Sequence, residues 1–229
     1  MMETLFNGFT LDIPPGTFPL STDSMALAHF ARLPRRSSVL ALGSGCAARG
    51  LLLCAKDPGC QVTGVELDSA AHAAALDNIR RNGLEARLSS ICADLRQVPS
   101  LFSPGSFRCC ISNPPYFSGG PAAALTGARR EDHCTLEDLF ASAAWALQYG
   151  GDFFLVHRPE RLAEVCACAS RHGLEPKRLT LLRHKTDGPV SLILLSCRKG
   201  GKPGLVWEEQ SLYTSEGAQT PYFKEVYSL

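Results

Sequence analysis

The tetrad Asn113-Pro114-Pro115-Tyr116 has the residue types needed to hold an amino group while it reacts. Consecutive prolines fix the backbone and have no N–H, so the Asn113 side-chain oxygen and the Pro114 carbonyl can both accept from an –NH2 group. This geometry orients the nitrogen lone pair towards an electrophilic methyl group. Tyr116, with Phe117 beside it, offers an aromatic face for a planar base. We expect Asn113, Pro114 and Tyr116 to be catalytic and Tyr116 and Phe117 to bind substrate; the alternative is a plain Pro-Pro turn.

A glycine-containing turn, Gly43-Ser44-Gly45, follows an apolar strand that we predict over 38–42. Glycine lets the backbone turn sharply and approach a ligand closely. The longer glycine fingerprint of dinucleotide-binding enzymes is not met, because the third residue after Gly45 is Ala48. We expect Gly43 and Gly45 to contact a cofactor, although an ordinary strand–helix turn could contain the same residues.

Acidic residues follow the next two predicted strands. Glu66 ends a strand about 20 residues past the glycines, where a carboxylate can accept hydrogen bonds from both ribose hydroxyls of a nucleoside cofactor. The alternative role, a helix N-terminal acid, suits Asp68 better. Asp94 could accept from an adenine amine while the Ala93 backbone donates; the alternative for Asp94 is a capping or turn aspartate.

Strands and helices alternate along the chain, which predicts an α/β, doubly wound, mostly parallel seven-stranded sheet with helices on both faces. Its last two strands form a C-terminal antiparallel hairpin. Ligands bind such sheets at the carboxyl ends of strands, near the switch in strand order, and the candidate residues follow predicted strands. The strands are predicted over 38–42, 61–66, 86–92, 107–112, 152–157, 175–184 and 190–198, and helices over 24–33, 70–82, 136–149 and 160–172, with another through 51–53.

Composition narrows the possible partners and the compartment. The net charge of +1 argues neither for nor against nucleic acid, but 157–205 holds ten Lys/Arg against four acids, which could meet phosphates or form solvated faces. Met1 to Thr10 does not read as a signal peptide, so we expect the ten cysteines to be free in a reducing cytoplasm. Neither zinc spacing nor a membrane-length apolar run is seen, so we expect no metal and no membrane contact.

With these motifs the chain resembles the class I S-adenosylmethionine-dependent methyltransferases, which are Rossmann-like, and specifically the branch with an Asn-Pro-Pro-Tyr motif. Within that branch it is similar to the bacterial tRNA1(Val) adenine-37 N6-methyltransferase family. The segments that carry the closer match are 21–28, 64–68, 111–117 and 157–162.

The resemblance implies roles for the candidate residues. Gly43 and Gly45 would approach the methionine part of S-adenosylmethionine, Glu66 its ribose and Asp94 its adenine. Asn113 and Tyr116 would hold a target adenine. The basic region 158–202, which begins at Arg158, would hold phosphates of the nucleic-acid partner, a tRNA.

The residue pattern along the chain also predicts its organisation. We expect an irregular or hairpin lead-in over 1–23, a methyltransferase domain over 24–205, and a tail over 206–229 packed on that domain.

The glycine loop departs from the family pattern. Ala41 stands where an acid is usual, Ala47 where a third glycine is usual, and Arg49 where apolar residues are common. These changes leave two alternatives beside a tRNA enzyme. One is an amino methyltransferase acting on rRNA, DNA or protein glutamine, and the other is a non-catalytic binding protein that kept the fold.

Overall fold

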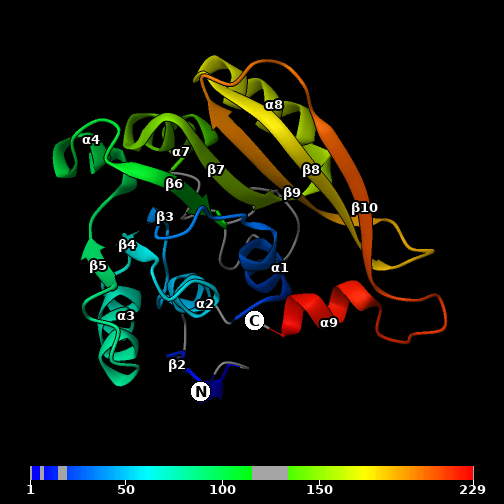
Figure 1. Ribbon diagram of the computed structural model, residues 1–229, viewed down its shortest axis with the longest axis horizontal. Coiled ribbons are helices and arrows are strands. Elements are labelled where there is room, and N and C mark those ends of the chain that lie inside the picture. Colours follow the sequence, from blue (N-terminus) through cyan, green and yellow to red (C-terminus); the bar gives the residue numbers. More distant parts are fainter. Residues whose placement is uncertain (1, 6–7, 15–19, 115–133, 229) are drawn as a thin grey trace.

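A computed structural model describes residues 2–5, 8–14, 20–114 and 134–228 (Figure 1). A sheet of eight strands runs in the order β10-β8-β9-β7-β6-β3-β4-β5, and β1 pairs with β2 in a separate antiparallel hairpin. The strands are β1 (Met2–Thr4), β2 (Thr10–Asp12), β3 (Ser38–Leu42), β4 (Gln61–Glu66), β5 (Leu88–Cys92), β6 (Phe107–Ser112), β7 (Leu147–His157), β8 (Leu174–Lys185), β9 (Val190–Lys199) and β10 (Val206–Tyr213). The helices are α1 (Thr22–Phe30), α2 (Ala48–Lys56), α3 (Ser69–Arg81), α4 (Val98–Leu101), α7 (Leu136–Ala146), α8 (Leu162–Arg171) and α9 (Pro221–Tyr227), with 3-10 turns η1 (Leu95–Gln97) and η2 (Pro159–Arg161).

The pairing confirms the α/β fold and corrects the number of strands. Strands β3 to β7 pair in parallel and β9 runs antiparallel between β7 and β8, as the predicted hairpin requires. The sheet has eight strands and not seven, because β10 adds in parallel to β8. Glu208 accepts from the Thr180 hydroxyl at 2.9 Å, and Glu209 pairs with Arg183 at 3.2 Å. These acids make the segment look like a surface tail in the sequence although it is an edge strand.

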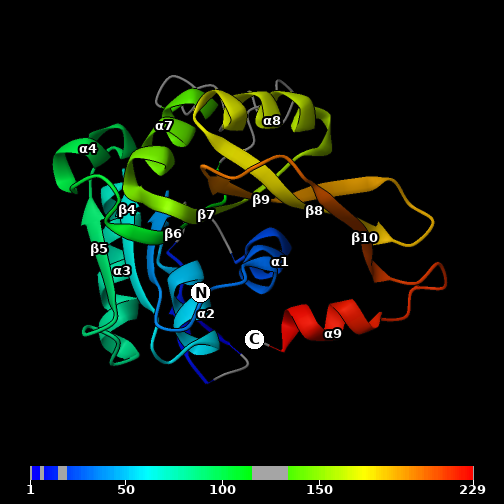
Figure 2. The same cartoon turned by 45° about the horizontal axis from the view of Figure 1, so that its top comes forward.

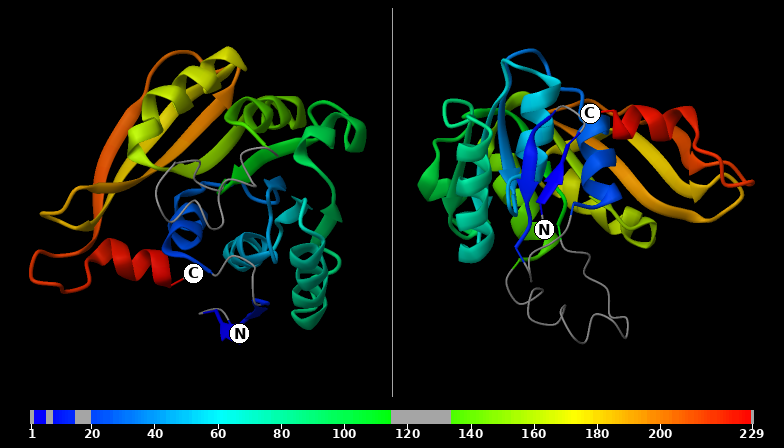
Figure 3. Two further views of the ribbon diagram at one scale, coloured as in Figure 1. Left: turned by 180° about the vertical axis from the view of Figure 1, so that it is seen from behind. Right: turned by 90° about the horizontal axis from the view of Figure 1, so that it is seen from below.

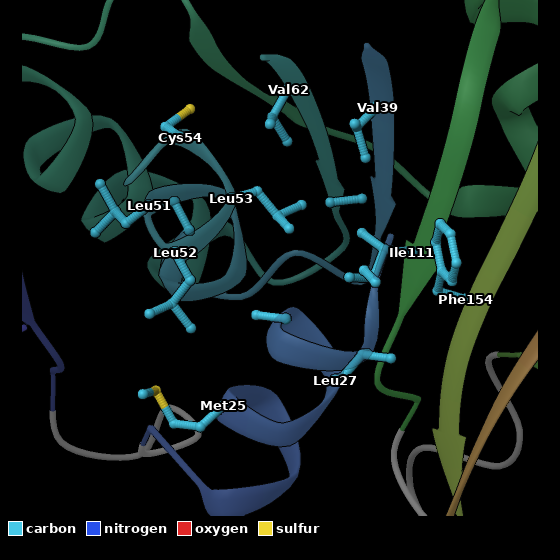
Figure 4. Packing of buried hydrophobic residues seen from close by; sticks show 14 of the residues in the cluster. Met25, Leu27, Val39, Leu51, Leu52, Leu53, Cys54, Val62, Ile111 and Phe154 are labelled. Atoms are coloured by element: carbon cyan, nitrogen blue, oxygen red, sulfur yellow. The ribbon is translucent and has the colours of Figure 1, made fainter. Parts of the chain in front are cut away.

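Helices cover both faces of the sheet, as a doubly wound fold requires. Figure 2 shows α7 and α8 on one face and α1 and α2 on the other. One buried cluster joins α1, α2 and α3 to the sheet, and a second joins α7 and α8 to its other face. Figure 4 shows Leu53 of α2 pointing towards the strands that carry Val39 and Val62, and Leu52 and Met25 on the side of this cluster away from the sheet.

Helix α1 is fastened at its carboxyl end by a lysine from α2. Lys56 Nζ donates to the carbonyl oxygens of Ala28, His29 and Ala31 at 3.0, 2.8 and 2.8 Å. These acceptors are among the last carbonyls of the helix, which have no partner within it. The helix ends at Phe30, earlier than predicted, because Ala31 is already extended.

Helix α1 is also held at its start and by the sheet. The Thr22 and Tyr227 hydroxyls lie 2.8 Å apart, and α9 runs beside α1 in both views of Figure 3. Arg178 of β8 lies over the Phe30 ring, 3.9 Å from its centroid, and donates to the Phe30 carbonyl. Contacts from three other elements therefore fix the position of α1.

Candidate active site

The strand register brings the candidate residues to one edge of the sheet. Leu42 pairs with Val65 on one side and with Ser112 on the other. The Ser112 hydroxyl donates to the Leu42 carbonyl at 2.9 Å and joins the ends of β3 and β6. Gly43 and Asn113, the next residues, therefore start side by side where the strand order switches, and this is where such sheets bind ligands.

The glycine loop has the backbone of a ligand-binding turn. Gly43 and Gly45 have φ values of 65° and 58°, in the left-handed region that favours glycine. A Cβ built on either would meet no described atom within 4 Å, so the space beside both is open. The buried Ser44 hydroxyl packs against Gly64 of β4, where a Cβ would lie 2.6 Å from it. The open side of the loop is therefore at Gly43 and Gly45, where a ligand can approach the backbone.

Ala47 also has a left-handed backbone, with φ 71°, as it leads into α2. This conformation costs a non-glycine residue about 1–2 kcal/mol. The structure thus shows why a third glycine would suit this position. The chain keeps the loop geometry with alanine instead.

Glu66 lies at the end of β4 facing the loop. Its Oε2 accepts from the Gly45 N–H at 2.7 Å, and its Oε1 accepts from the Asp68 N–H at 2.9 Å. Each carboxylate oxygen can accept more than one hydrogen bond, so capacity for two ribose hydroxyls remains. Asp68 instead caps α3 by accepting from the Ala70 and Ala71 N–H groups. The structure gives the two acids different roles.

Asp94 follows β5 and is already engaged. It caps η1 by accepting from the Arg96 N–H at 2.9 Å, and its carboxylate pairs with the Arg96 side chain. The capping alternative is therefore present in this structure, beside any role towards adenine. The Ala93 N–H donates to the Glu66 carbonyl at 2.9 Å, so this donor is used in the extension of the sheet.

Asn113 is half-buried at the end of β6 and Pro114 is buried. The Asn113 Nδ2 donates to the Ser24 hydroxyl of α1 at 3.3 Å, across 89 residues of sequence. Pro115, Tyr116 and Phe117 lie outside the described residues. Just before Asn113, burial raises the pKa of the Cys109 thiol to about 11 and that of Cys110 well above its usual range. These thiols are packing groups and not nucleophiles.

Arg158 lies past the end of β7, at the same edge of the sheet as Asn113. It is exposed, and its side chain donates to the Ser191 carbonyl at 3.3 Å. Its backbone N–H donates to Nδ1 of the buried His157 at 2.8 Å. Burial lowers the pKa of His157 to about 4, so the ring is neutral near pH 7.

The basic region holds less available charge than the sequence count suggests. Four of its ten cations pair with acids, and three of the partners, Glu137, Asp152 and Glu209, lie outside 157–205. The four cations are Arg161, Arg171, Arg183 and Arg198. The sequence count could not include partners that only the fold brings close.

Arg49 also lies at this site, although the sequence predicted no role for it. It lies in the first turn of α2, is 7% exposed, and donates from Nη2 to the Gly43 carbonyl. The buried Ala41 lies on the adjoining strand, where the family usually has an acid. Compared with the usual family pattern, the glycine loop therefore lacks a negative charge at Ala41 and carries a positive one at Arg49. The sequence signal that could have identified Arg49 was an arginine at a position where apolar residues are common in the family.

Among the described residues, one cluster outside the site has side chains that could bind a metal. Ligand atoms of Glu137, Cys168 and His172 lie within 4.8 Å of one another between α7 and α8. The carboxylate is shared by Arg171 and by His172 Nε2, the latter at 2.6 Å. These bonds link α7 to the carboxyl end of α8.

Three comparisons bear on this site. The family model described as methyltransferase small domain matches residues 21–166, which is more than half of the chain. The chain belongs to this methyltransferase family. The enzyme is thus an S-adenosylmethionine-dependent methyltransferase, and the match covers the loop, Glu66, Asp94 and Asn113.

Relatives of this methyltransferase share a modest fraction of its sequence. The tRNA1(Val) (adenine(37)-N6)-methyltransferase of Bacteroides fragilis is 26% identical, over 83% of this chain and 81% of the relative. A protein of the same name from Shewanella sp. strain MR-4 is 29% identical, over 76% and 75%. The crystal structure of a predicted O-methyltransferase from Agrobacterium tumefaciens superposes with a TM-score of 0.74 at 22% identity, over 89% and 94%, which shows the shared fold. No helix in the described part of the methyltransferase has the length and apolar character to span a membrane.

Proposed function

We propose that this methyltransferase transfers a methyl group from S-adenosylmethionine to the N6 amino group of an adenine in tRNA. The observation that carries the proposal is the placement of Asn113 beside the glycine loop with its Nδ2 turned to Ser24. The opposite end of the carboxamide, Oδ1, is then left to accept from a substrate amine.

The chain's own residues would bind and align the two reactants. The loop from Gly43 to Gly45 and the Glu66 carboxylate would hold the amino-acid and ribose parts of the cofactor. S-adenosylmethionine supplies a methyl group on a positively charged sulfur. As the new N–C bond forms, the S–C bond breaks, and the amine loses one proton to water. Asn113 Oδ1 and the Pro114 carbonyl would align the nitrogen, so no strong base is needed.

The proposal that the substrate is tRNA rests on the similarity to curated relatives and on one exposed cation, Arg158. Curated relatives named as tRNA adenine methyltransferases match over most of this chain. Arg158 lies at the same edge of the sheet as Asn113, where a phosphate near a flipped adenine would pass. A tRNA substrate would place the protein in the cytoplasm, a compartment where its ten free thiols stay reduced.

Methyl transfer from labelled S-adenosylmethionine tests the proposal. The acceptors are tRNA from a strain that lacks this gene, rRNA, duplex DNA and total protein, assayed in parallel. We expect label in tRNA, recovered as N6-methyladenosine after digestion. Asn113→Ala should reduce incorporation by at least a hundredfold, while Gln148→Ala, which removes an exposed amide of β7, should not.

Each other outcome has a defined meaning. Incorporation that Asn113→Ala leaves unchanged would overturn the role of the tetrad. Label in rRNA, DNA or protein alone would replace the acceptor and keep the chemistry. Binding of S-adenosylhomocysteine without transfer to any acceptor would favour the non-catalytic alternative.

A further inference from the structure

Helix α1 contributes a hydroxyl to the site from outside the strand-loop motifs. Ser24, the third residue of α1, is 5% exposed, and its Oγ lies 3.3 Å from Asn113 Nδ2. We infer that Ser24 is a positioning residue that orients the Asn113 carboxamide for the substrate amine. The inference rests on the proposed function of Asn113.

The two ends of a carboxamide have nearly the same shape but opposite hydrogen-bonding character. An amine substrate needs the oxygen of Asn113, because the carboxamide NH2 would turn its hydrogens towards the hydrogens of the substrate. In the structure Ser24 Oγ accepts from Nδ2, and Oδ1 faces away from α1. One net hydrogen bond of ordinary strength restrains the carboxamide by roughly five- to tenfold in population.

The position of the hydroxyl is set by the anchors of α1. Lys56 and Arg178 bind carbonyls at the carboxyl end of the helix, and the Thr22 and Tyr227 hydroxyls meet near its start. Ser24 therefore cannot follow a carboxamide that rotates without disturbing α9, β8 or α2. A hydrogen-bond partner in a fixed position restrains the Asn113 carboxamide more than a mobile water would.

Steady-state kinetics with tRNA and S-adenosylmethionine test the inference. Ser24→Ala should lower kcat by about five- to tenfold with little change in KM for either substrate, because reactive alignment is lost and not binding. Ser24→Thr keeps the hydroxyl and should restore most of kcat. Ser21→Ala is the matched control, because Ser21 caps the same helix by accepting from the Ser24 backbone N–H, whereas Asn113 bonds to the Ser24 hydroxyl. It should lower the melting temperature and leave kcat unchanged.

A double-mutant cycle separates positioning from a structural effect. Ser24→Ala should lower kcat in the wild-type background and have no further effect in Asn113→Ala. Unchanged kcat in Ser24→Ala, or an equal loss in both backgrounds, would overturn the inference. Full activity of Asn113→Ala would instead show that the proposed role of Asn113, on which the inference rests, has failed. Melting temperatures of all variants identify any loss of folded protein.

Discussion

Glu66 Oε2 accepts the Gly45 N–H at 2.7 Å, which ties the end of β4 to the glycine loop that follows the neighbouring strand β3. The same carboxylate accepts the N–H of Asp68, whose own side chain caps α3. Two acids two residues apart thus have separable roles. One faces the candidate cofactor site and the other stabilises a helix.

Glu66→Ala should weaken binding of S-adenosylhomocysteine by at least about tenfold, because a charged acceptor for ribose hydroxyls is lost. Asp68→Ala should leave that affinity within about twofold and lower the free energy of unfolding by about 1 kcal/mol, the usual value of a helix cap. Calorimetric titration and urea denaturation measure the two quantities. Equal loss of affinity in both variants would mean that Glu66 acts only through the fold of the loop.

Ala47→Gly should stabilise the protein. The left-handed backbone of Ala47 is strained for alanine, and removal of its Cβ relieves about 1 kcal/mol after the greater freedom of glycine in the unfolded chain is counted. Ala73→Gly, at an exposed position inside α3, should destabilise by about 1 kcal/mol. Urea denaturation of both variants tests the opposite signs, and destabilisation by Ala47→Gly would contradict the strain argument.

The sequence predicted the sheet well where apolar runs are short and bounded by turn residues. The structure confirms three strands at the predicted residues, 38–42, 61–66 and 107–112. It shows helix α7 ending at Ala146 and β7 beginning at Leu147, although the sequence suggested helix to Tyr149. Edge strand β10 was missed because its first four residues are all exposed, two apolar and two acidic, so no alternation marks a strand and only the pairing with β8 identifies it.

The sequence could predict only those site residues that directly end or follow a strand. Placement after successive parallel strands brings Gly43, Glu66 and Asn113 together, and the register bears this out. The contact between Ser24 and Asn113 spans 89 residues and depends on how α1 packs, which local patterns do not encode. The same holds for three of the four arginine ion pairs in the basic region, whose acidic partners lie outside 157–205.

His157 should make the protein sensitive to acid. Burial lowers its pKa to about 4, whereas the unfolded chain takes up this proton near pH 6.5. The unfolded state then binds more protons between these values, so stability is full above pH 6.5 and falls as the pH drops towards 4, by about 3 kcal/mol in total.

Urea denaturation at pH 7.5, 6.0 and 4.5 measures this slope. His157→Asn, which keeps an acceptor for the Arg158 N–H, should lose stability at neutral pH and show a flatter slope. His184→Asn, at an exposed position, is the control and should keep the wild-type slope. Parallel curves for wild type and His157→Asn would show that other groups cause the acid sensitivity.

Arg49 should select for a carboxylate in the cofactor. Its guanidinium binds the Gly43 carbonyl where the methionine part is proposed to lie, and Ala41 leaves that end without the usual acid. Arg49→Met should therefore weaken binding of S-adenosylhomocysteine by about tenfold, as loss of one charge-assisted hydrogen bond implies. Binding of 5′-methylthioadenosine, which has no amino-acid part, should change by less than about twofold.

Arg80→Met, which removes an exposed arginine of α3, should affect neither ligand. Equal weakening of both ligands by Arg49→Met would instead assign Arg49 to the conformation of the loop, and melting temperatures would show whether the loop had lost stability.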